Sequence, residues 1–322
     1  MMVYITEEEV RKVVTTKMAL AVFRKAYEEC AKGRIYAGGR VMFPIRGEEN
    51  TAQWLTANCL DAPIFGSKLS TTFPGNWERG LPVTVSQISL YSAETGKLIA
   101  LLEANYLTAV KTGGSAAIAT DLMARKDAGR LGVIGSGQQA FSQVQSIQEV
   151  RELTQVLVYD ANPDRAKDFA ERVEGIRNRP YAVAPAESAD ACVSASDIVC
   201  TCTTSHTPVF DGEALKPGTH VNAIGSYTPF MQEIDEKTVL RAARITSEHV
   251  DGLWEAAGDI LIPFEKGLIA RDKVTGSVGD VLTGKVAGRM DDNEITLYES
   301  VGSSVLDVSI AIATYNLLYP QS

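Results

Sequence analysis

The chain has 322 residues, 45% of them hydrophobic and 22% charged, which is the composition of a globular protein with about two domains. Its net charge of -9, from 31 basic and 40 acidic residues, argues against nucleic-acid binding, because such binding depends on phosphate neutralisation by Lys and Arg. No apolar run reaches the roughly 20 residues of a membrane span, and the acidic start MMVYITEEEV does not resemble a signal peptide.

The five cysteines have no spacing typical of a disulfide framework, which indicates reduced thiols and a cytoplasmic location. Cys200 and Cys202 form a C-x-C pair on a predicted strand. A metal site there would need further ligands, and His206, His220 and His249 are not spaced as a ligand set. We therefore interpret the pair as small apolar thiols and predict no metal site.

Two helices are predicted at the start of the chain. Thr6 and Glu9 have the spacing of a capping box, and apolar residues follow at helical intervals. A second helix is predicted over residues 17–32 and ends before Gly33, the residue type that most often follows a helix C-terminus.

A sheet is predicted next, between residues 40 and 107. Short apolar stretches alternate there with turns, and no long helical period lies between them, which favours an antiparallel or mixed sheet. An Ala- and Thr-rich helix follows over residues 106–125. Gly113 and Gly114 within it permit the close approach of another backbone or of a ligand.

After residue 130 strands and helices alternate. The predicted strands cover 131–134, 155–159, 197–201 and 220–224, and the predicted helices 138–150, 163–173 and 186–195. Such alternation is typical of an α/β fold, a Rossmann-type doubly wound parallel sheet with helices on both faces. An amphipathic helix predicted over 303–319 returns to the first domain, so the second domain is inserted into the first.

The turn after the strand at 131–134 has the pattern of a dinucleotide-binding loop. Gly135 permits a tight turn, Gly137 lets the backbone approach a pyrophosphate, and Ala140 permits close packing of helix on strand. Asp160 ends the second strand, about 20 residues further on, where an acid binds the adenosine ribose. This favours NAD(H), and the nearby Arg165 keeps NADP(H) as the alternative. The other interpretation is a glycine-rich turn without a ligand.

Basic residues near turns of the first region form a candidate anion site. They are Arg40, Lys68, Lys111 and, as a fourth candidate, Arg46. Each one alone is more typical of a solvated surface charge. Together they would supply the local positive charge that an acidic protein needs to bind a carboxylate.

Several of these stretches, in this order, resemble the ornithine cyclodeaminase/mu-crystallin family along nearly the whole chain. The matching stretches are GGRVMFP, K-x5-PGN-x3-GLP, LTAVKTGGSAAIAT, VIGSGQQA, VNAIGSYTP and SVGSSVLDV. Members include ornithine cyclodeaminase, archaeal alanine dehydrogenase, ketimine and pyrroline-2-carboxylate reductases, and a thyroid-hormone-binding crystallin.

The resemblance implies a homodimer with two domains. Residues 1–118 with 303–322 are expected to form a mixed α+β domain for substrate binding and dimerisation. Residues 119–302 are expected to form the NAD(P)-binding Rossmann domain. This arrangement explains why the dinucleotide turn comes so late in the chain.

The resemblance also implies roles for the polar residues of the first domain. Arg40 matches the arginine that binds the substrate carboxylate, and Lys68 the lysine beside the reacting amine or imine, the expected catalytic residue. Lys111 stands where most members have a second arginine, and a lysine gives a point charge instead of a bidentate fork. Gln53 appears at the position of a glutamate of the cyclodeaminase pocket, and Tyr227 at that of an aspartate.

Without these two acids a diamine substrate would lack a counter-charge for its second ammonium, which is expensive to bury. We therefore predict reduction of a cyclic 2-imino acid, such as Δ1-pyrroline-2-carboxylate or its six-membered homologue, by hydride transfer from NAD(P)H. The alternatives are ornithine cyclodeamination, an alanine-dehydrogenase-like reaction, and a non-catalytic crystallin-like binding protein.

The residues expected to contact the dinucleotide lie in the glycine turn, at the ends of the following strands and at two helical positions outside them. They are Thr112, Gly135, Ser136, Gly137, Gln138, Gln139, Asp160, Thr201, Thr203, Ala223, Gly225 and Ser303. Asp307 has two interpretations. It matches a family position near the nicotinamide, and it is also an acid in a helix first turn, where the helix dipole favours it.

Overall fold

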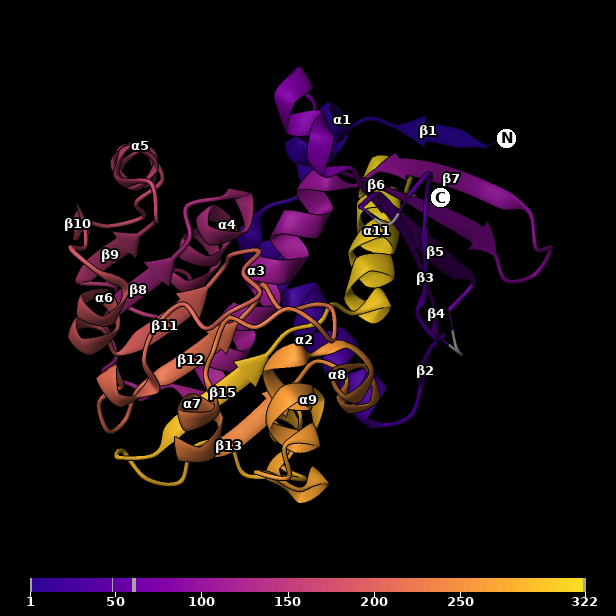
Figure 1. Ribbon diagram of the computed structural model, residues 1–322. Helices are drawn as coiled ribbons and strands as arrows, with labels where there is room; N and C mark the ends of the chain where they lie inside the picture. Colours follow the sequence, from indigo (N-terminus) through magenta and orange to yellow (C-terminus); the bar gives the residue numbers. More distant parts are fainter. Residues whose placement is uncertain (1, 48, 60–61, 321–322) are drawn as a thin grey trace. The chain divides into compact units, whose positions relative to one another are not determined.

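The computed structural model describes residues 2–47, 49–59 and 62–320. The chain divides into two compact units, Met1–Lys111 with Ser303–Ser322 (unit 1) and Thr112–Gly302 (unit 2). Figure 1 shows the chain leaving unit 1 through helix α3 (Asn105–Met123) and returning to it in α11 (Ser304–Leu318). The division lies within α3, before the boundary at residue 118 that the sequence suggested. No described helix is both long and apolar enough to cross a membrane.

In its described residues, unit 1 contains a mixed sheet, three α-helices that lie wholly within it and one 3-10 helix. Its described strands follow the order β1-β7-β6-β5-β4-β2, with β3 paired to β4, and only β1 with β7 is parallel. The elements are β1 (Val3–Ile5), α1 (Glu7–Val13), α2 (Thr16–Ala31), β2 (Ile35–Ala37), β3 (Val41–Pro44), β4 (Thr51–Cys59), β5 (Ile64–Thr72), the 3-10 helix Pro74–Arg79, β6 (Thr84–Ser92), β7 (Leu98–Glu103) and α11. The predicted mixed sheet is confirmed.

Local signals explain the start of unit 1, and tertiary packing explains its last helix. Thr6 and Glu9 form the predicted capping box of α1. The expectation of an amphipathic helix near the C-terminus is wrong, because α11 packs against α2 and against β4, β5 and β6. Val308 of α11 lies so close to Gly66 of β5 that a Cβ there would stand 3.2 Å from its methyl group. Most side chains of the first three turns of α11 are therefore buried.

Unit 2 contains the predicted doubly wound sheet. The order is β10-β9-β8-β11-β12-β15-β13-β14, and every described pairing is parallel. From β10 to β15 this is the strand order of dinucleotide-binding Rossmann domains, with its reversal between β8 and β11. The strands are β8 (Arg130–Ile134), β9 (Gln155–Tyr159), β10 (Ala182–Pro185), β11 (Ile198–Thr201), β12 (His220–Ala223), β13 (Ala242–Ser247), β14 (Gly276–Ser277) and β15 (Ile295–Glu299).

Helices cover both faces of this sheet. They are α3, α4 (Gln138–Ile147), α5 (Pro163–Glu174), α6 (Ala189–Ala195), α7 (Glu236–Arg241), α8 (Val250–Ala256), α9 (Gly258–Glu265) and α10 (Val278–Leu282), with 3-10 turns at Gly212–Ala214 and Arg271–Lys273. An apolar core joins the central strands to α6, α7, α8 and α9 on one face. On the other, α3 packs against α4 at Gly113, where a Cβ would meet the Ser142 carbonyl oxygen. The close approach predicted at Gly113 is confirmed.

A buried polar network lies between β12 and α3. His220 Nδ1 is 2.9 Å from Thr296 Oγ1, and its Nε2 is 3.1 Å from Asn222 Oδ1. Asn222 Nδ2 in turn donates to Thr120 Oγ1 at 3.0 Å. Burial, with a smaller contribution from the nearby Arg289 guanidinium, lowers the pKa of His220 to about 3. The imidazole is therefore neutral in the folded chain at neutral pH.

We expect this neutral imidazole to make the fold acid-sensitive. The unfolded chain binds a proton at His220 near pH 6.5, whereas the folded chain resists it until about pH 3. The unfolding free energy should therefore fall as the pH is lowered from 6.5, by up to about 1.4 kcal/mol per pH unit. Urea unfolding of wild type and His220→Gln between about pH 4 and pH 7 measures this slope. The slope should flatten in His220→Gln and persist in His206→Gln, where the histidine is exposed; equal slopes in all three proteins would contradict the expectation.

Candidate active site

Lys68 is the best-defined residue of the candidate site in unit 1. It lies on β5 between Leu55 of β4 and Ile88 of β6, and its side chain is only 4% exposed. Its Nζ donates to Oδ1 of Asp307 at 3.0 Å, and Asp307 on α11 is completely buried. The strand pairing and the packing of α11 on the sheet thus bring together two residues far apart in the sequence.

Arg40 and Gln53 form the second contact of this site. Arg40 precedes β3, and Met42, two residues later on that strand, is paired with Gln53 of β4. With its amide oriented to satisfy both side chains, the Gln53 oxygen accepts hydrogen bonds from Nη1 and Nε of Arg40, at 3.1 and 2.9 Å. Gln53 therefore fixes the direction in which the Arg40 guanidinium points.

Lys111 completes the cationic group. It lies on α3, is 5% exposed, and forms no ion pair within the part of unit 1 that the structure describes. Burial lowers the pKa of Lys68; Asp307 opposes this shift, and the charges of Lys111 and Arg40 add to it. Lys111 and Arg40 are therefore close enough to Lys68 for their charges to act on it. Arg46, the fourth basic candidate, is exposed in the turn after β3.

This group carries more positive than negative charge. Arg40, Lys68 and Lys111 contribute three cationic side chains, and Asp307 contributes one carboxylate. A partly buried surplus of positive charge is stabilised by an anion. Oδ2 of Asp307 is buried and has no hydrogen-bond partner among the described residues, so it can accept a bond from an N–H of a ligand. The arrangement suits a small molecule with a carboxylate beside a nitrogen.

The glycine turn of unit 2 has the backbone that the sequence predicted. Gly135 has φ +93°, and a Cβ there would lie 2.6 Å from the carbonyl oxygen of Cys202. A Cβ on Gly137 would have no atom within 4 Å, so no internal contact of the described chain explains this glycine. No side chain caps the N-terminus of α4. Free backbone N–H groups beside open space are what a pyrophosphate requires.

Asp160 lies beside this turn. Its Oδ2 accepts from the backbone N–H and the hydroxyl of Ser136, at 3.1 and 2.6 Å, and its Oδ1 accepts from the Asn162 N–H at 2.9 Å. A carboxylate held at the end of β9 suits a ribose with free hydroxyls and repels a 2′-phosphate. Arg165, which supported NADP(H), is an exposed residue of α5.

The other predicted cofactor residues fall into three places. Thr201 and Ala223 end β11 and β12, and Thr203 and Gly225 follow them. Gln138 is exposed and Gln139 half-buried at the start of α4, while Thr112 is buried on α3 as the first residue of unit 2. Ser303 precedes α11 and belongs to unit 1. None of these contacts with a dinucleotide is tested by the fold alone, so they remain predictions.

Two buried acids of unit 2 were missed by the sequence analysis. Glu233 accepts from the backbone N–H groups of Thr203 and Gly225, and Asp259 accepts from those of Glu233 and Ile234. Nothing in the local pattern distinguished these carboxylates from surface acids.

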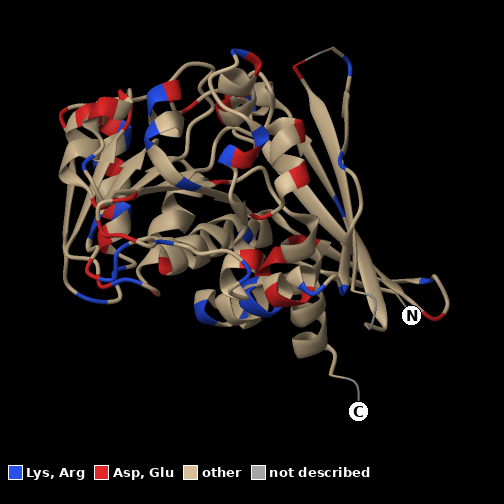
Figure 2. Ribbon diagram, turned by 90° about the horizontal axis from the view of Figure 1, so that it is seen from below, with Lys and Arg blue, Asp and Glu red and all other residues tan. Residues whose placement is uncertain are grey.

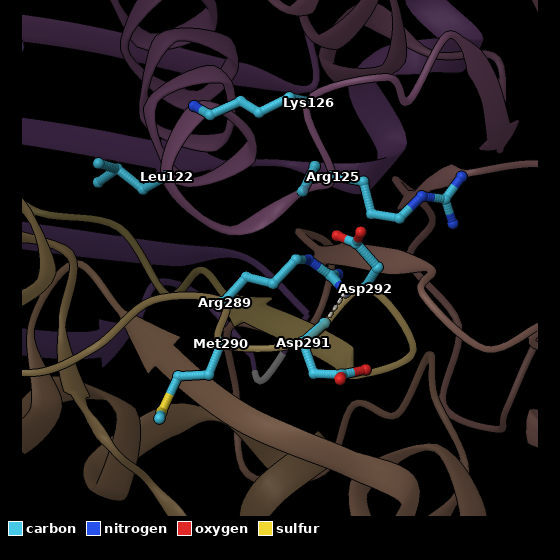
Figure 3. A pocket seen from close by; sticks show the side chains of 8 residues that line it. Leu122, Arg125, Lys126, Arg289, Met290, Asp291 and Asp292 are labelled. Atoms are coloured by element: carbon cyan, nitrogen blue, oxygen red, sulfur yellow. Dashed lines mark hydrogen bonds between the residues drawn. The ribbon is translucent and has the colours of Figure 1, made fainter.

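A separate hollow of about 410 Å³ lies in unit 2 beside the C-terminal end of α3. Figure 3 shows Arg289 and the two acids after it facing Leu122 and Lys126 across this space. Arg289 donates to the carbonyl oxygens of Met123 and Asp291 and to Thr296 Oγ1. The Arg289 guanidinium is used in hydrogen bonds that hold the loop before β15 in place. We therefore do not consider this hollow a candidate for the active site.

Residues 2–320 match the sequence profile of the ornithine cyclodeaminase/mu-crystallin family. The chain belongs to that family. The resemblance inferred from the motifs is thereby confirmed.

Individual relatives agree with this assignment. A Δ1-pyrroline-2-carboxylate reductase of Bacillus cereus is 32% identical, with 98% of this chain and 96% of the relative covered. The structure of Thermococcus litoralis Δ1-pyrroline-2-carboxylate reductase in complex with NADH and L-proline has a TM-score of 0.93 at 30% identity, covering 99% of this chain and 98% of the other. An archaeal alanine dehydrogenase dimer with bound NAD has a TM-score of 0.92 at 29% identity, covering 100% and 98%.

We expect Lys68 and Asp307 to depend strongly on each other for stability. Asp307→Asn leaves the Lys68 ammonium without its counter-charge and should lower the unfolding free energy by about 3 kcal/mol at neutral pH. The deficit should shrink as the pH rises toward 10.5, because Lys68, whose folded-state pKa is lowered, then becomes neutral in the folded state of both proteins. Denaturant unfolding of both single variants and of Lys68→Met/Asp307→Asn measures the coupling.

The double variant should lose much less stability than the sum of the two single variants. The exposed Lys12–Glu8 pair, 2.7 Å apart, is the matched control, and Glu8→Gln should leave stability nearly unchanged. Strict additivity of the Lys68 and Asp307 effects would show that the buried pair is not coupled.

Proposed function

We propose that this protein reduces a cyclic 2-imino acid of the Δ1-pyrroline-2-carboxylate type to the cyclic amino acid with NAD(P)H. The observation that carries the proposal is the cationic group of unit 1, in which Oδ2 of Asp307, without a hydrogen-bond partner among the described residues, accompanies the positive charges of Arg40, Lys68 and Lys111. A carboxylate and an imine nitrogen on adjacent atoms match these two features. The similar Δ1-pyrroline-2-carboxylate reductases support the same substrate class.

The dinucleotide would bind in unit 2. The turn at Gly135 and Gly137 with the uncapped α4 would hold its pyrophosphate, and Asp160 its adenosine ribose. NAD(H) is favoured because Asp160 is a fixed carboxylate; the similar structures contain NADH and NAD. When bound, NADH supplies the hydride from its nicotinamide ring.

Arg40 and Lys111 would bind the substrate carboxylate. Arg40 gives a planar fork, held in place by Gln53, and so sets the orientation of the carboxylate. Lys111 adds charge with little directional preference. Fixing the imine carbon in one orientation is the main catalytic contribution expected from these side chains.

Lys68 and Asp307 would act at the imine nitrogen. Burial and the neighbouring cations lower the pKa of Lys68, so its Nζ gives up a proton more readily than an exposed lysine does. Transfer of this proton to the imine nitrogen would form the iminium, which accepts a hydride at carbon. Oδ2 of Asp307 would accept the hydrogen bond of the new N–H, and its charge would stabilise the cation.

Cyclodeamination is disfavoured by the absence of two acids. Tyr227 is half-buried in the segment after β12, where burial raises its pKa, so it is neutral at neutral pH. Gln53 is neutral and is bonded to Arg40. Neither residue can accept a proton from the second amino group of ornithine, and neither can balance its charge.

The decisive assay follows NADH consumption by the purified protein with Δ1-pyrroline-2-carboxylate. We expect fast oxidation of NADH, slower oxidation of NADPH, and no ammonia from ornithine. In Arg40→Lys the KM for the imine should rise by about tenfold or more, since a bidentate contact is lost. Ammonia and proline from ornithine, with no net change in NAD, would overturn the proposal. NADH loss with pyruvate plus ammonia only would indicate an alanine dehydrogenase.

We also propose a homodimer formed through the sheet of unit 1. On the face turned away from α11, large apolar side chains are exposed: Tyr36, Val41, Phe43, Trp54, Leu69 and Val85. In Figure 2 the long strands of this sheet are mostly tan, with few charged residues. A contiguous apolar face of this kind is typical of a protein–protein interface. The similar archaeal alanine dehydrogenase is a dimer, which supports the proposal.

We further propose that unit 1 binds the substrate and forms the dimer, the role expected of residues 1–118 with 303–322, and that unit 2 binds NAD(P), the role expected of residues 119–302; the structural division falls slightly earlier, after Lys111. The cytoplasmic location inferred from the thiols also stays a proposal; all five cysteines are free.

Trp54→Asp should dissociate the dimer. Trp54 is 50% exposed at the centre of the apolar face, and a buried carboxylate there would raise the dimer dissociation constant by roughly 100-fold or more. Sedimentation velocity over a concentration series measures the shift. Leu240→Asp, on α7 of unit 2 and 47% exposed, is the control and should leave the oligomeric state unchanged. A Trp54→Asp protein that sediments as wild type would refute this interface.

A further inference from the structure

Glu233 joins the ends of two neighbouring strands of unit 2. It precedes α7 and is completely buried. Its two carboxylate oxygens accept from the backbone N–H groups of Thr203 and Gly225, at 2.5 and 2.6 Å. Thr203 follows β11 and Gly225 follows β12, and these two strands pair in parallel. One side chain therefore holds together the chain at the carboxyl ends of both strands.

The packing around this contact leaves no space for a side chain at Gly225. A Cβ on Gly225 would lie 2.1 Å from the Thr203 carbonyl oxygen and 2.6 Å from the Glu233 carboxylate. The residue before Thr203, Cys202, has its carbonyl oxygen against Gly135 in the β8–α4 turn. The position of the chain after β11 thus depends on Glu233 on one side and on the glycine turn on the other.

Asp259 holds the backbone at Glu233 in place. Its Oδ1 accepts from the backbone N–H groups of Glu233 and Ile234, at 2.7 and 3.0 Å, and it lies on α9 completely buried. Two buried carboxylates in series therefore connect α9 to the ends of β11 and β12. Both acids are completely buried, so water does not compete for these bonds and the connection is rigid.

The position of Glu233 and Asp259 beside the ends of β11 and β12 indicates their role. Dinucleotides bind across the carboxyl ends of Rossmann strands, where the strand order reverses. That reversal lies between β8 and β11. The glycine turn follows β8 and Asp160 follows β9, on the side of the pyrophosphate and adenosine. The ends of β11 and β12 lie on the other side, which leaves them the nicotinamide half.

We propose that Glu233 is a positioning residue for the nicotinamide half of the cofactor. It shapes the chain at Thr203 and Gly225 through two backbone bonds, and Asp259 holds it in place. This inference rests on the proposed binding of NAD(H), but not on the identity of the substrate.

The test compares two ligands in wild type and Glu233→Gln. The amide side chain in Glu233→Gln has one acceptor oxygen, so it can accept only one of the two backbone N–H bonds. The ends of β11 and β12 are then no longer joined through one side chain. NADH affinity, followed by energy transfer from tryptophan to bound NADH, should fall by roughly tenfold, the loss of one charge-assisted bond. ADP lacks the nicotinamide half, and its affinity, measured by competition, should stay within about twofold of wild type.

Asp197→Asn is the matched control. Asp197 is also a buried carboxylate with two backbone bonds, from Gly129 and Arg130, but it lies before β11 at the opposite end of the same strands. This variant should lose stability and keep wild-type affinity for both NADH and ADP. Equal weakening of NADH and ADP binding in Glu233→Gln would mean a general structural role, and no weakening of either would also overturn the proposal.

A second variant keeps the test decisive if Glu233→Gln does not fold. Asp259→Ala removes the acceptor Oδ1 and with it the bonds to Glu233 and Ile234, so a loss of NADH affinity with unchanged ADP affinity is expected. An Asp259→Ala protein that binds NADH as wild type does would count against the proposal. These titrations contain no imine. A loss of NADH affinity without a loss of ADP affinity would therefore support the proposal even if the protein reduces another substrate. Failure of wild type to bind NADH would instead refute the proposed function.

Discussion

The buried ion pair between Lys68 and Asp307 is the interaction on which the candidate site of unit 1 depends. A lysine on the inner face of a sheet is tolerable only with a partner, and α11 provides that partner when it packs on β5. Arg40 and Lys111 then leave the group with more positive than negative charge. The net charge of the whole chain, -9, does not describe this region. An acidic protein can therefore bind an acidic substrate, because the field of a few buried cations dominates at short range.

In unit 2 the candidate site for an anionic ligand consists of backbone N–H groups instead of charged side chains. The N–H groups after β11 and β12 are occupied by Glu233, and that of Ser136 by Asp160. The N-terminus of α4, in contrast, has no side-chain cap. Among the described residues, some backbone donors around the turn are thus satisfied by side chains, while those at the start of α4 have no side-chain cap and suit a pyrophosphate. The proposed selectivity for a dinucleotide therefore depends on which backbone N–H groups already have side-chain partners, as well as on which are open to a ligand.

Elements with a local signal were predictable, and elements defined by tertiary packing were not. The capping box of α1, the glycine turn and the alternation of strands and helices depend on neighbouring residues, and each is found as expected. β10 was missed because it is a short edge strand ending in Pro185. The prediction of an amphipathic α11 failed because its polar residues, Asp307 among them, are buried by contacts from distant strands. Glu233 was missed for the same reason, since its partners follow strands elsewhere in the sequence.

The difference between Arg40 and Lys111 bears on the substrate range. Gln53 holds the Arg40 guanidinium, so one end of the proposed carboxylate site is rigid. Lys111 is buried without an ion pair within the described part of unit 1, and its ammonium has rotational freedom that a second guanidinium would lack. One rigid and one adaptable contact define the position of a carboxylate while permitting a small rotation of the attached ring. If these residues bind the substrate as proposed, such a site would orient the imine carbon while tolerating five- and six-membered rings, and Lys111→Arg would replace that tolerance with a stricter orientation.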